Sequence, residues 1–138
     1  MLDLTTEQGR TAERRLREEE IVWLTTVRRD GQPQAVPVWF LWDGATVLIY
    51  SQPRTQKLRN VRGNPRVALN LNSDPFGNAI VRVEGTAEIV DDAPPASQVP
   101  AMVEKYRAGI RRIGMDPAAF ATAYSVAIRV QPDRFHLG

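Results

Sequence analysis

The sequence predicts a single domain over residues 1–138 that is mainly β (α+β): a six-stranded antiparallel split or closed β-barrel with peripheral helices. A chain of 138 residues suits one domain with one core. Six runs rich in β-branched and aromatic residues are separated by turn signals. Helical patterns are confined to the N-terminus, one short middle segment and one insertion before the last run. A two-layer α+β sandwich is the alternative arrangement of these elements.

The first half of the chain predicts one polar helix and three strands. Residues 1–19 are expected to hold the helix, with a thin apolar stripe at Ala12 and Leu16. The expected strands are residues 20–28, 33–42 and 45–51. Two Asp-Gly turns join them, so we expect an antiparallel meander. Pro37 indicates an edge strand or a bulge within the second run, because proline cannot donate to a strand ladder.

The second half predicts a short basic helix, three further strands and a helical insertion. The basic helix is expected over residues 55–62. The remaining strands are expected over residues 66–72, 79–90 and 124–135. Gly85 indicates a bulge or tight bend in the second of these. The insertion spans residues 93–123, where an amphipathic helix begins at the acidic and proline-rich residues 91–95 and a shorter helix begins at Asp116.

The composition excludes several classes of chemistry. Cysteine is absent and His136 is the only histidine, which excludes disulfide scaffolds, thiolate nucleophiles and multi-histidine metal sites. No apolar run approaches the roughly 20 residues that span a bilayer, and the polar N-terminus is unlike a signal peptide. We therefore expect a cytoplasmic protein with no membrane span and no metal site. If it is an enzyme, its chemistry comes from a bound cofactor.

One segment of the chain is strongly basic. Between Asp43 and Asp74 the sequence has no acidic residue. The cations of this window are Arg54, Lys57, Arg59, Arg62 and Arg66. Lys57 falls in the first turn of the expected helix, where free N–H groups and the helix dipole attract an anion, and the Thr55 hydroxyl is close in sequence. This pattern indicates a phosphate or carboxylate site; the alternative is that these side chains extend into water. A nucleic-acid surface is not expected, because no aromatic stacking platform accompanies the charge.

The aromatic run that contains Trp39 is the second candidate feature. The indole ring can lie against a flat ligand, or it can pack in the core or at a dimer interface. Pro37 removes a ladder donor and leaves nearby backbone groups free to bond a ring edge.

The segment from Thr25 to Leu71 resembles the flavin- and deazaflavin-binding split-barrel superfamily, which includes pyridoxamine 5′-phosphate oxidase and F420-dependent reductases. The resembling features are a strand that ends in Tyr50-Ser51, a loop that closes on Lys57, and the run Asn64-Pro65-Arg66-Val67-Ala68-Leu69. The later run Val83-Glu84-Gly85-Thr86-Ala87-Glu88 is similar to the family's V-x-G-x-A strand. The similarity covers roughly residues 18–90.

The resemblance implies a homodimer with a cofactor between the subunits. Lys57 would hold the cofactor phosphate, Tyr50 and Ser51 would contribute backbone and hydroxyl contacts, and residues 36–39 would line the ring. The full set of implied cofactor-binding residues is Val36, Pro37, Val38, Trp39, Tyr50, Ser51, Arg54, Thr55, Gln56, Lys57 and Asn60. No catalytic residue stands out.

Two departures from the oxidases narrow the implied function. Gln56 stands where the oxidases carry an arginine. The run Arg134-Phe135-His136 falls too early to be their substrate motif, so we expect no pyridoxamine 5′-phosphate oxidase activity. The short, arginine-rich chain is closer to members that use F420, whose phosphate and oligoglutamate tail suit a basic segment. We therefore expect an F420-dependent oxidoreductase that reduces a small organic acceptor. The alternatives are an FMN-binding oxidase or reductase and a non-catalytic cofactor-binding protein.

Overall fold

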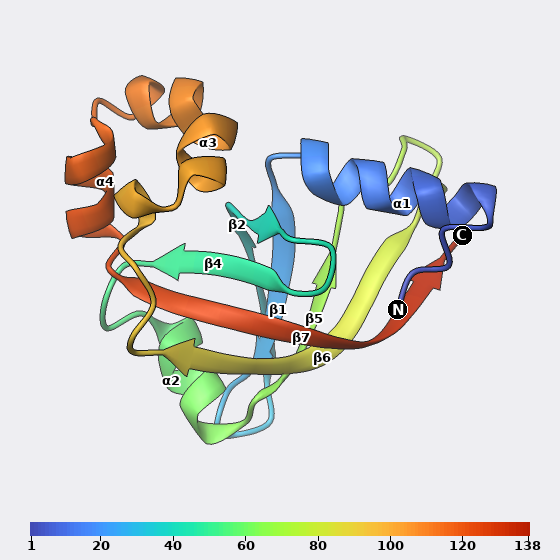
Figure 1. Ribbon diagram of the computed structural model, residues 1–138. Coiled ribbons are helices and arrows are strands. Elements are labelled where there is room, and N and C mark those ends of the chain that lie inside the picture. The colour runs from blue at the N-terminus through green and yellow to red at the C-terminus, as the bar shows by residue number, and fades with distance from the viewer.

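The computed structural model describes residues 1–138 and contains seven strands, four α-helices and one short 3-10 helix (Figure 1). The elements are α1 (Glu7–Glu18), β1 (Val22–Val27), β2 (Pro33–Val38), β3 (Leu41–Trp42), β4 (Val47–Ser51), α2 (Gln56–Gly63), β5 (Arg66–Asn70), β6 (Val81–Val90), η1 (Ala96–Gln98), α3 (Pro100–Arg112), α4 (Pro117–Ala123) and β7 (Val126–Leu137). The predicted split barrel with peripheral helices is confirmed, although the sheet has seven strands and not six. None of the helices has the length and apolarity that a membrane crossing requires.

All seven strands form one antiparallel sheet in the order β2-β1-β5-β6-β7-β4-β3. Figure 1 shows this sheet curled into a half-barrel. The strands β2 and β3 follow one another in the chain, yet they lie at opposite edges of the sheet. The predicted meander of three strands is therefore wrong, and the predicted strand over residues 33–42 is broken at Trp39 and Phe40. The expectation that Pro37 marks an edge strand is confirmed.

The break in the strand has a physical cause in the helical insertion. The Phe40 backbone N–H donates to the Tyr106 hydroxyl at 2.8 Å. The Phe40 carbonyl accepts from the same hydroxyl at 3.0 Å and from the Lys105 ammonium at 2.9 Å. Side chains of α3 thus satisfy the backbone groups that a continuous strand would have paired. The chain is free to cross from one edge of the sheet to the other at this point.

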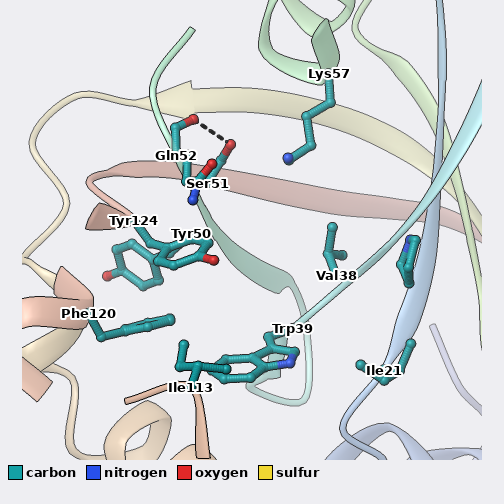
Figure 2. Close-up of a pocket in the computed structure, with 11 residues that line it drawn as sticks. Ile21, Val38, Trp39, Tyr50, Ser51, Gln52, Lys57, Ile113, Phe120 and Tyr124 are labelled. Carbon is teal, nitrogen blue, oxygen red and sulfur yellow. Dashed lines mark hydrogen bonds between the residues drawn. The ribbon is translucent and has the colours of Figure 1, made fainter. Parts of the chain in front are cut away.

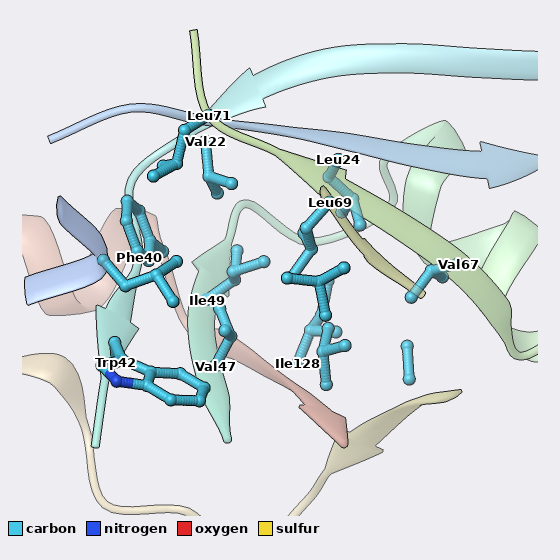
Figure 3. Packing of buried hydrophobic residues seen from close by; sticks show 14 of the residues in the cluster. Val22, Leu24, Phe40, Trp42, Val47, Ile49, Val67, Leu69, Leu71 and Ile128 are labelled. Atoms are coloured by element: carbon cyan, nitrogen blue, oxygen red, sulfur yellow. The ribbon is translucent and has the colours of Figure 1, made fainter. Parts of the chain in front are cut away.

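The interior of the half-barrel is a single apolar core (Figure 3). Inward-facing residues of several strands, such as Leu24, Ile49 and Ile128, are fully buried there. The helix α1 closes this core with Ala12 and Leu16, which confirms the predicted stripe. The helix α2 contributes its own apolar face in the same way.

A second, smaller core lies on the outer side of β4 and β7 beneath the insertion. It joins Leu48 and Tyr50 of β4 to buried residues of α3 and α4. The strand β4 is therefore buried on both faces. The prediction that the amphipathic helix begins at residues 91–95 is wrong, since α3 begins at Pro100. Pro94 and Pro95 instead lie outside any helix or strand, and the Pro94 carbonyl accepts a 2.6 Å hydrogen bond from the Tyr50 hydroxyl.

The predicted irregularity at Gly85 is confirmed, because the register of β6 on β7 shifts between Glu84 and Gly85. A Cβ atom at this position would lie 2.4 Å from the Gln131 carbonyl oxygen. Glycine is thus required for the close approach of the two longest strands.

We expect Gly85→Ala to lower the free energy of unfolding by about 1–3 kcal/mol, because the added methyl group overpacks the bulge. Gly63→Ala is the matched control: its Cβ would meet nothing within 4 Å, so stability should stay level or rise by up to about 1 kcal/mol. Urea unfolding followed by tryptophan fluorescence measures both. Equal midpoints for Gly85→Ala and the wild type would contradict the close approach.

Candidate functional site

A cavity of about 450 Å³ opens where β2 and β4 end, between the start of α2 and the α3–α4 insertion. Its lining residues are Ile21, Pro37, Val38, Trp39, Tyr50, Ser51, Gln52, Lys57, Ile113, Phe120 and Tyr124. Figure 2 shows Lys57 and Ser51 on one side of this space and Trp39, Ile113 and Phe120 on the other. The cavity is therefore polar along one edge and apolar along the opposite one. Its volume lies in the range of small-molecule sites.

Lys57 is the only cation on the cavity wall. The side chain is half-buried, and this burial lowers the pKa of its ammonium group, with no neighbouring carboxylate to oppose the shift. A half-buried ammonium group without an acidic partner is unfavourable on its own. An anion beside it would supply the missing charge; the anion site itself stays a prediction.

The start of α2 adds backbone donors to the same corner. Thr55 is the N-cap residue, but its side chain makes no capping hydrogen bond. Its hydroxyl instead lies 3.2 Å from the Ser51 hydroxyl oxygen. The first-turn N–H groups of α2 are thus free of a side-chain cap, and the helix dipole is positive there.

Arg54 shapes the turn that leads into α2. Its φ angle of 64° lies in the left-handed region, which is costly for a residue with a Cβ atom. In this conformation the Arg54 carbonyl accepts a 3.0 Å hydrogen bond from the Arg59 guanidinium. Strain of this kind often marks a functional loop. The Arg54 side chain itself is exposed and does not line the cavity.

Trp39 forms the apolar floor of the cavity and also packs against the insertion. Its ring stacks on Tyr106 at a centroid distance of 4.6 Å and an angle of 8°. It also stacks on Phe120 at 5.4 Å and 22°. A Cβ atom at Gly109 would lie 3.1 Å from the indole, so glycine there lets Trp39 lie close to α3. Trp39 therefore packs against the insertion and at the same time lines the cavity, so neither sequence-based interpretation of this ring excludes the other.

Burial raises the pKa of Tyr106 well above its usual value, which keeps its hydroxyl protonated. That hydroxyl accepts from the Phe40 N–H and donates toward the Glu20 and Phe40 carbonyls. Tyr106 thus ties α3 to the segment before β1 and to the crossover that carries Trp39. Its role in positioning the floor of the cavity is not visible from sequence.

Two of the sequence-predicted residues lie in a second cavity on the other side of α2. Gln56 and Asn60 line a polar space of about 660 Å³ together with Arg28, Arg29 and Arg59. Asn60 is buried and its amide donates to Thr26 and Gln34 at 2.9 Å, so it links α2 to β1 and β2. Gln56 donates to the Asn60 amide oxygen at 2.8 Å.

The first cavity therefore contains Pro37, Val38, Trp39, Tyr50, Ser51 and Lys57 from the sequence-predicted set. Val36 is exposed on the edge strand, and Thr55 borders the cavity through Ser51.

Sequence reasoning missed Ile21, Gln52, Ile113, Phe120 and Tyr124. The sequence assigns Phe120 to the short helix and Tyr124 to the start of the last strand, and no local signal places either residue beside Trp39. No cluster of three or more acidic or histidine side chains that would hold a metal ion is present.

The fold places this chain in the class of small split-barrel proteins. Residues 9–137 match the family described as pyridoxamine 5′-phosphate oxidase, and the chain belongs to that family. The sequence-based recognition is thereby confirmed.

Three solved structures illustrate the range of this fold. An F420 reductase is 31% identical, with 90% of this chain and 94% of that chain covered and a TM-score of 0.69. A FAD-binding protein from Mesorhizobium loti is 20% identical, with 91% and 89% covered and a TM-score of 0.67. The HutZ heme storage protein from Vibrio cholerae is 15% identical, with 96% and 95% covered and a TM-score of 0.66. The last two likenesses concern the fold alone.

We expect Tyr106→Phe to lower the free energy of unfolding by about 1–3 kcal/mol, because it leaves the buried Phe40 N–H of the crossover without its partner. The variant should also shift tryptophan emission, since Trp39 stacks on this ring. Tyr124→Phe is the control, because Tyr124 stacks on Phe120 and its hydroxyl has no protein partner. Unfolding midpoints and emission spectra test both variants. A Tyr106→Phe variant as stable as Tyr124→Phe would contradict the role given to the hydrogen bonds of the Tyr106 hydroxyl.

Proposed function

We propose that this protein is an oxidoreductase that uses the deazaflavin coenzyme F420 as hydride carrier to reduce a small organic acceptor. The observation that carries the proposal is the unpaired Lys57 ammonium beside an uncapped helix start, at the polar edge of a 450 Å³ cavity with an aromatic floor. The 31% identity with an F420 reductase over nine-tenths of the chain supports the choice of cofactor.

The residues of the cavity fit a flat cofactor that carries a phosphate. Lys57 and the first-turn N–H groups of α2 would hold the phosphate by charge-assisted hydrogen bonds. Trp39 and Val38 would lie against the ring. Because β2 is a sheet edge, part of its backbone has no strand partner and is free to bond the polar edge of that ring. When bound, the reduced deazaflavin supplies the hydride; the protein binds and orients it.

The second cavity favours F420 over FMN, the alternative cofactor. Its lining is almost entirely polar, with three arginines and no acidic residue. Arg59 is oriented by hydrogen bonds to the Arg54 carbonyl and the Gln56 amide oxygen. An oligoglutamate tail that leaves the Lys57 corner would meet Arg29 and Arg59, since Arg28 is already paired with Asp30, whereas FMN has no tail to place there. Lys57 and Trp39 would serve either cofactor equally well.

A non-catalytic role, such as the heme storage of the structurally similar Vibrio cholerae protein, has less support. The only histidine, His136, lies on β7 opposite Arg82 and is not part of the cavity wall. We also propose that the chain does not oxidise pyridoxamine 5′-phosphate, as the sequence departures indicate.

The proposal includes a homodimer with the cofactor at the subunit interface. The outward face of β1 and β2 presents Trp23, Thr25, Ala35 and Pro37, none of which is buried. An apolar surface of this kind favours a partner copy. Pro37 belongs both to this face and to the cavity wall, so a second subunit placed there would border the cofactor.

We expect Lys57→Ala to weaken cofactor binding about 10- to 150-fold, because it removes a charge-assisted contact worth roughly 1.5–3 kcal/mol. The fold should survive, since the change also removes a cation from a helix N-terminus. Arg62→Ala, on the same helix but outside both cavities, is the matched control and should weaken binding much less. Fluorescence titration with F420 and with FMN measures each dissociation constant. Equal affinities for Lys57→Ala and the wild type would remove the basis of the proposal.

Salt dependence separates the two cofactors. We expect Arg59→Ala to weaken F420 binding more at low salt than at high salt, because the tail carboxylates would meet its guanidinium. The same variant should bind FMN as the wild type does. A salt-dependent loss that is equal for both cofactors would argue against a tail site in the second cavity.

We expect light scattering at micromolar concentration to give twice the 15.5 kDa mass of the chain. Ala35→Arg places a charge in the outward face of β2 and should produce monomers, whereas Ala45→Arg, in the exposed turn before β4, should not. A monomeric wild type would refute the dimer.

A further inference from the structure

Lys105 is a distinctive group that the proposed function does not use. It lies on α3, where its ammonium donates a 2.9 Å hydrogen bond to the Phe40 carbonyl and lies 3.8 Å from the centre of the Phe40 ring. Lys105 and Lys57 are the only lysines of the chain, and Lys105 is not part of the cavity wall that Lys57 lines. Its two contacts place it at the crossover between β2 and β3.

The surroundings of this ammonium are mostly apolar and hold no ion-pair partner. The rings of Phe40 and Tyr106 that it faces are fully buried. None of the salt bridges of the chain includes Lys105, and the carboxylates of Glu19 and Glu20 act on it from further away. Desolvation therefore lowers the pKa of Lys105 to about 8, although both carboxylates favour its charged form. A lysine desolvated by apolar neighbours is an activated nucleophile.

The contacts of the Lys105 nitrogen leave one side of it open. A lysine ammonium has three N–H groups. The Phe40 carbonyl and the face of the Phe40 ring engage two of them, and no other group of the chain accepts a hydrogen bond from this nitrogen. Lys105 is only partly buried, so its remaining side is accessible from solvent. A neutral Lys105 can therefore keep both internal contacts while its lone pair is directed outward.

We infer that Lys105 is a site of covalent acylation by an activated acyl donor, either an acyl phosphate or an acyl thioester. The amine nitrogen bonds to the carbonyl carbon of the donor, the bond from that carbon to phosphate or thiolate breaks, and the nitrogen releases one proton to water. The amide that forms keeps an N–H for the Phe40 carbonyl and carries its acyl group on the open side. The reaction also removes a partly buried charge, so the fold should tolerate the product. This inference does not depend on the identity of the cofactor.

The test treats the cofactor-free protein with acetyl phosphate, and in a separate arm with acetyl-CoA, at about pH 7.5. Peptide mass spectrometry follows acetylation of Lys105 and Lys57. Lys105 should be acetylated about tenfold faster in the folded protein than in the urea-denatured chain, because only folding keeps much of it in the neutral form. Labelling by either donor supports the inference, and the comparison of the two arms identifies the donor.

Two glutamate variants separate the local environment from general exposure. Glu20→Gln removes a carboxylate that favours the charged form of Lys105, so it should speed acetylation at this position. Glu104→Gln is the matched control, because Glu104 is exposed on α3, bonds to Arg107 and does not act on Lys105; it should leave the rate unchanged. If Lys105 reacts no faster in the folded protein than in the denatured chain, or if Glu20→Gln slows the reaction, the inference is overturned.

Discussion

The hydroxyl group of Tyr106 is the point on which the arrangement of this protein depends. It satisfies both backbone groups of Phe40 at the place where the chain leaves one edge of the sheet for the other. Without the first of these bonds the buried Phe40 N–H would lack a partner, at a cost comparable to a large fraction of a small domain's stability, whereas the Phe40 carbonyl would keep its bond from Lys105. The same ring supports Trp39 from below. One side chain thus joins the topology of the half-barrel to the floor of its cavity.

The two apolar cores explain why the site lies where it does. The first core fills the half-barrel, and the second lies between the outer side of β4 and the insertion. The cavity opens beside the second core, next to the exposed start of α2. Apolar walls therefore come from packing that the fold needs in any case, and the polar edge comes from a helix start that no side chain caps. An aromatic floor beside a cationic corner follows from these two facts.

The two lysines of the chain differ in their surroundings. Lys105 is partly buried, donates to the Phe40 carbonyl, and lies 3.8 Å above the Phe40 ring. Desolvation lowers its pKa to about 8, although Glu20 and Glu19 favour its charged form. Lys57 has no such partners. Lys105 therefore finds its polar and charged partners within the chain, whereas Lys57 has none and is free to bind an anionic ligand.

Local sequence determined most elements of the sheet, the edge position of Pro37, the bulge at Gly85 and the place of Lys57 at a helix start. These features depend on turn residues, on periodicity and on the conformational limits of proline and glycine, all of which act within a few residues. The tertiary structure alone decided the break at Trp39 and Phe40, the position of Asn60 in a network with Thr26 and Gln34, and the aromatic wall from the insertion. Each of these depends on groups far apart in the chain, such as Tyr106 and Phe40, which are 66 positions apart. No local pattern encodes which distant side chain will satisfy a given backbone group, because that is settled only when the two cores pack together.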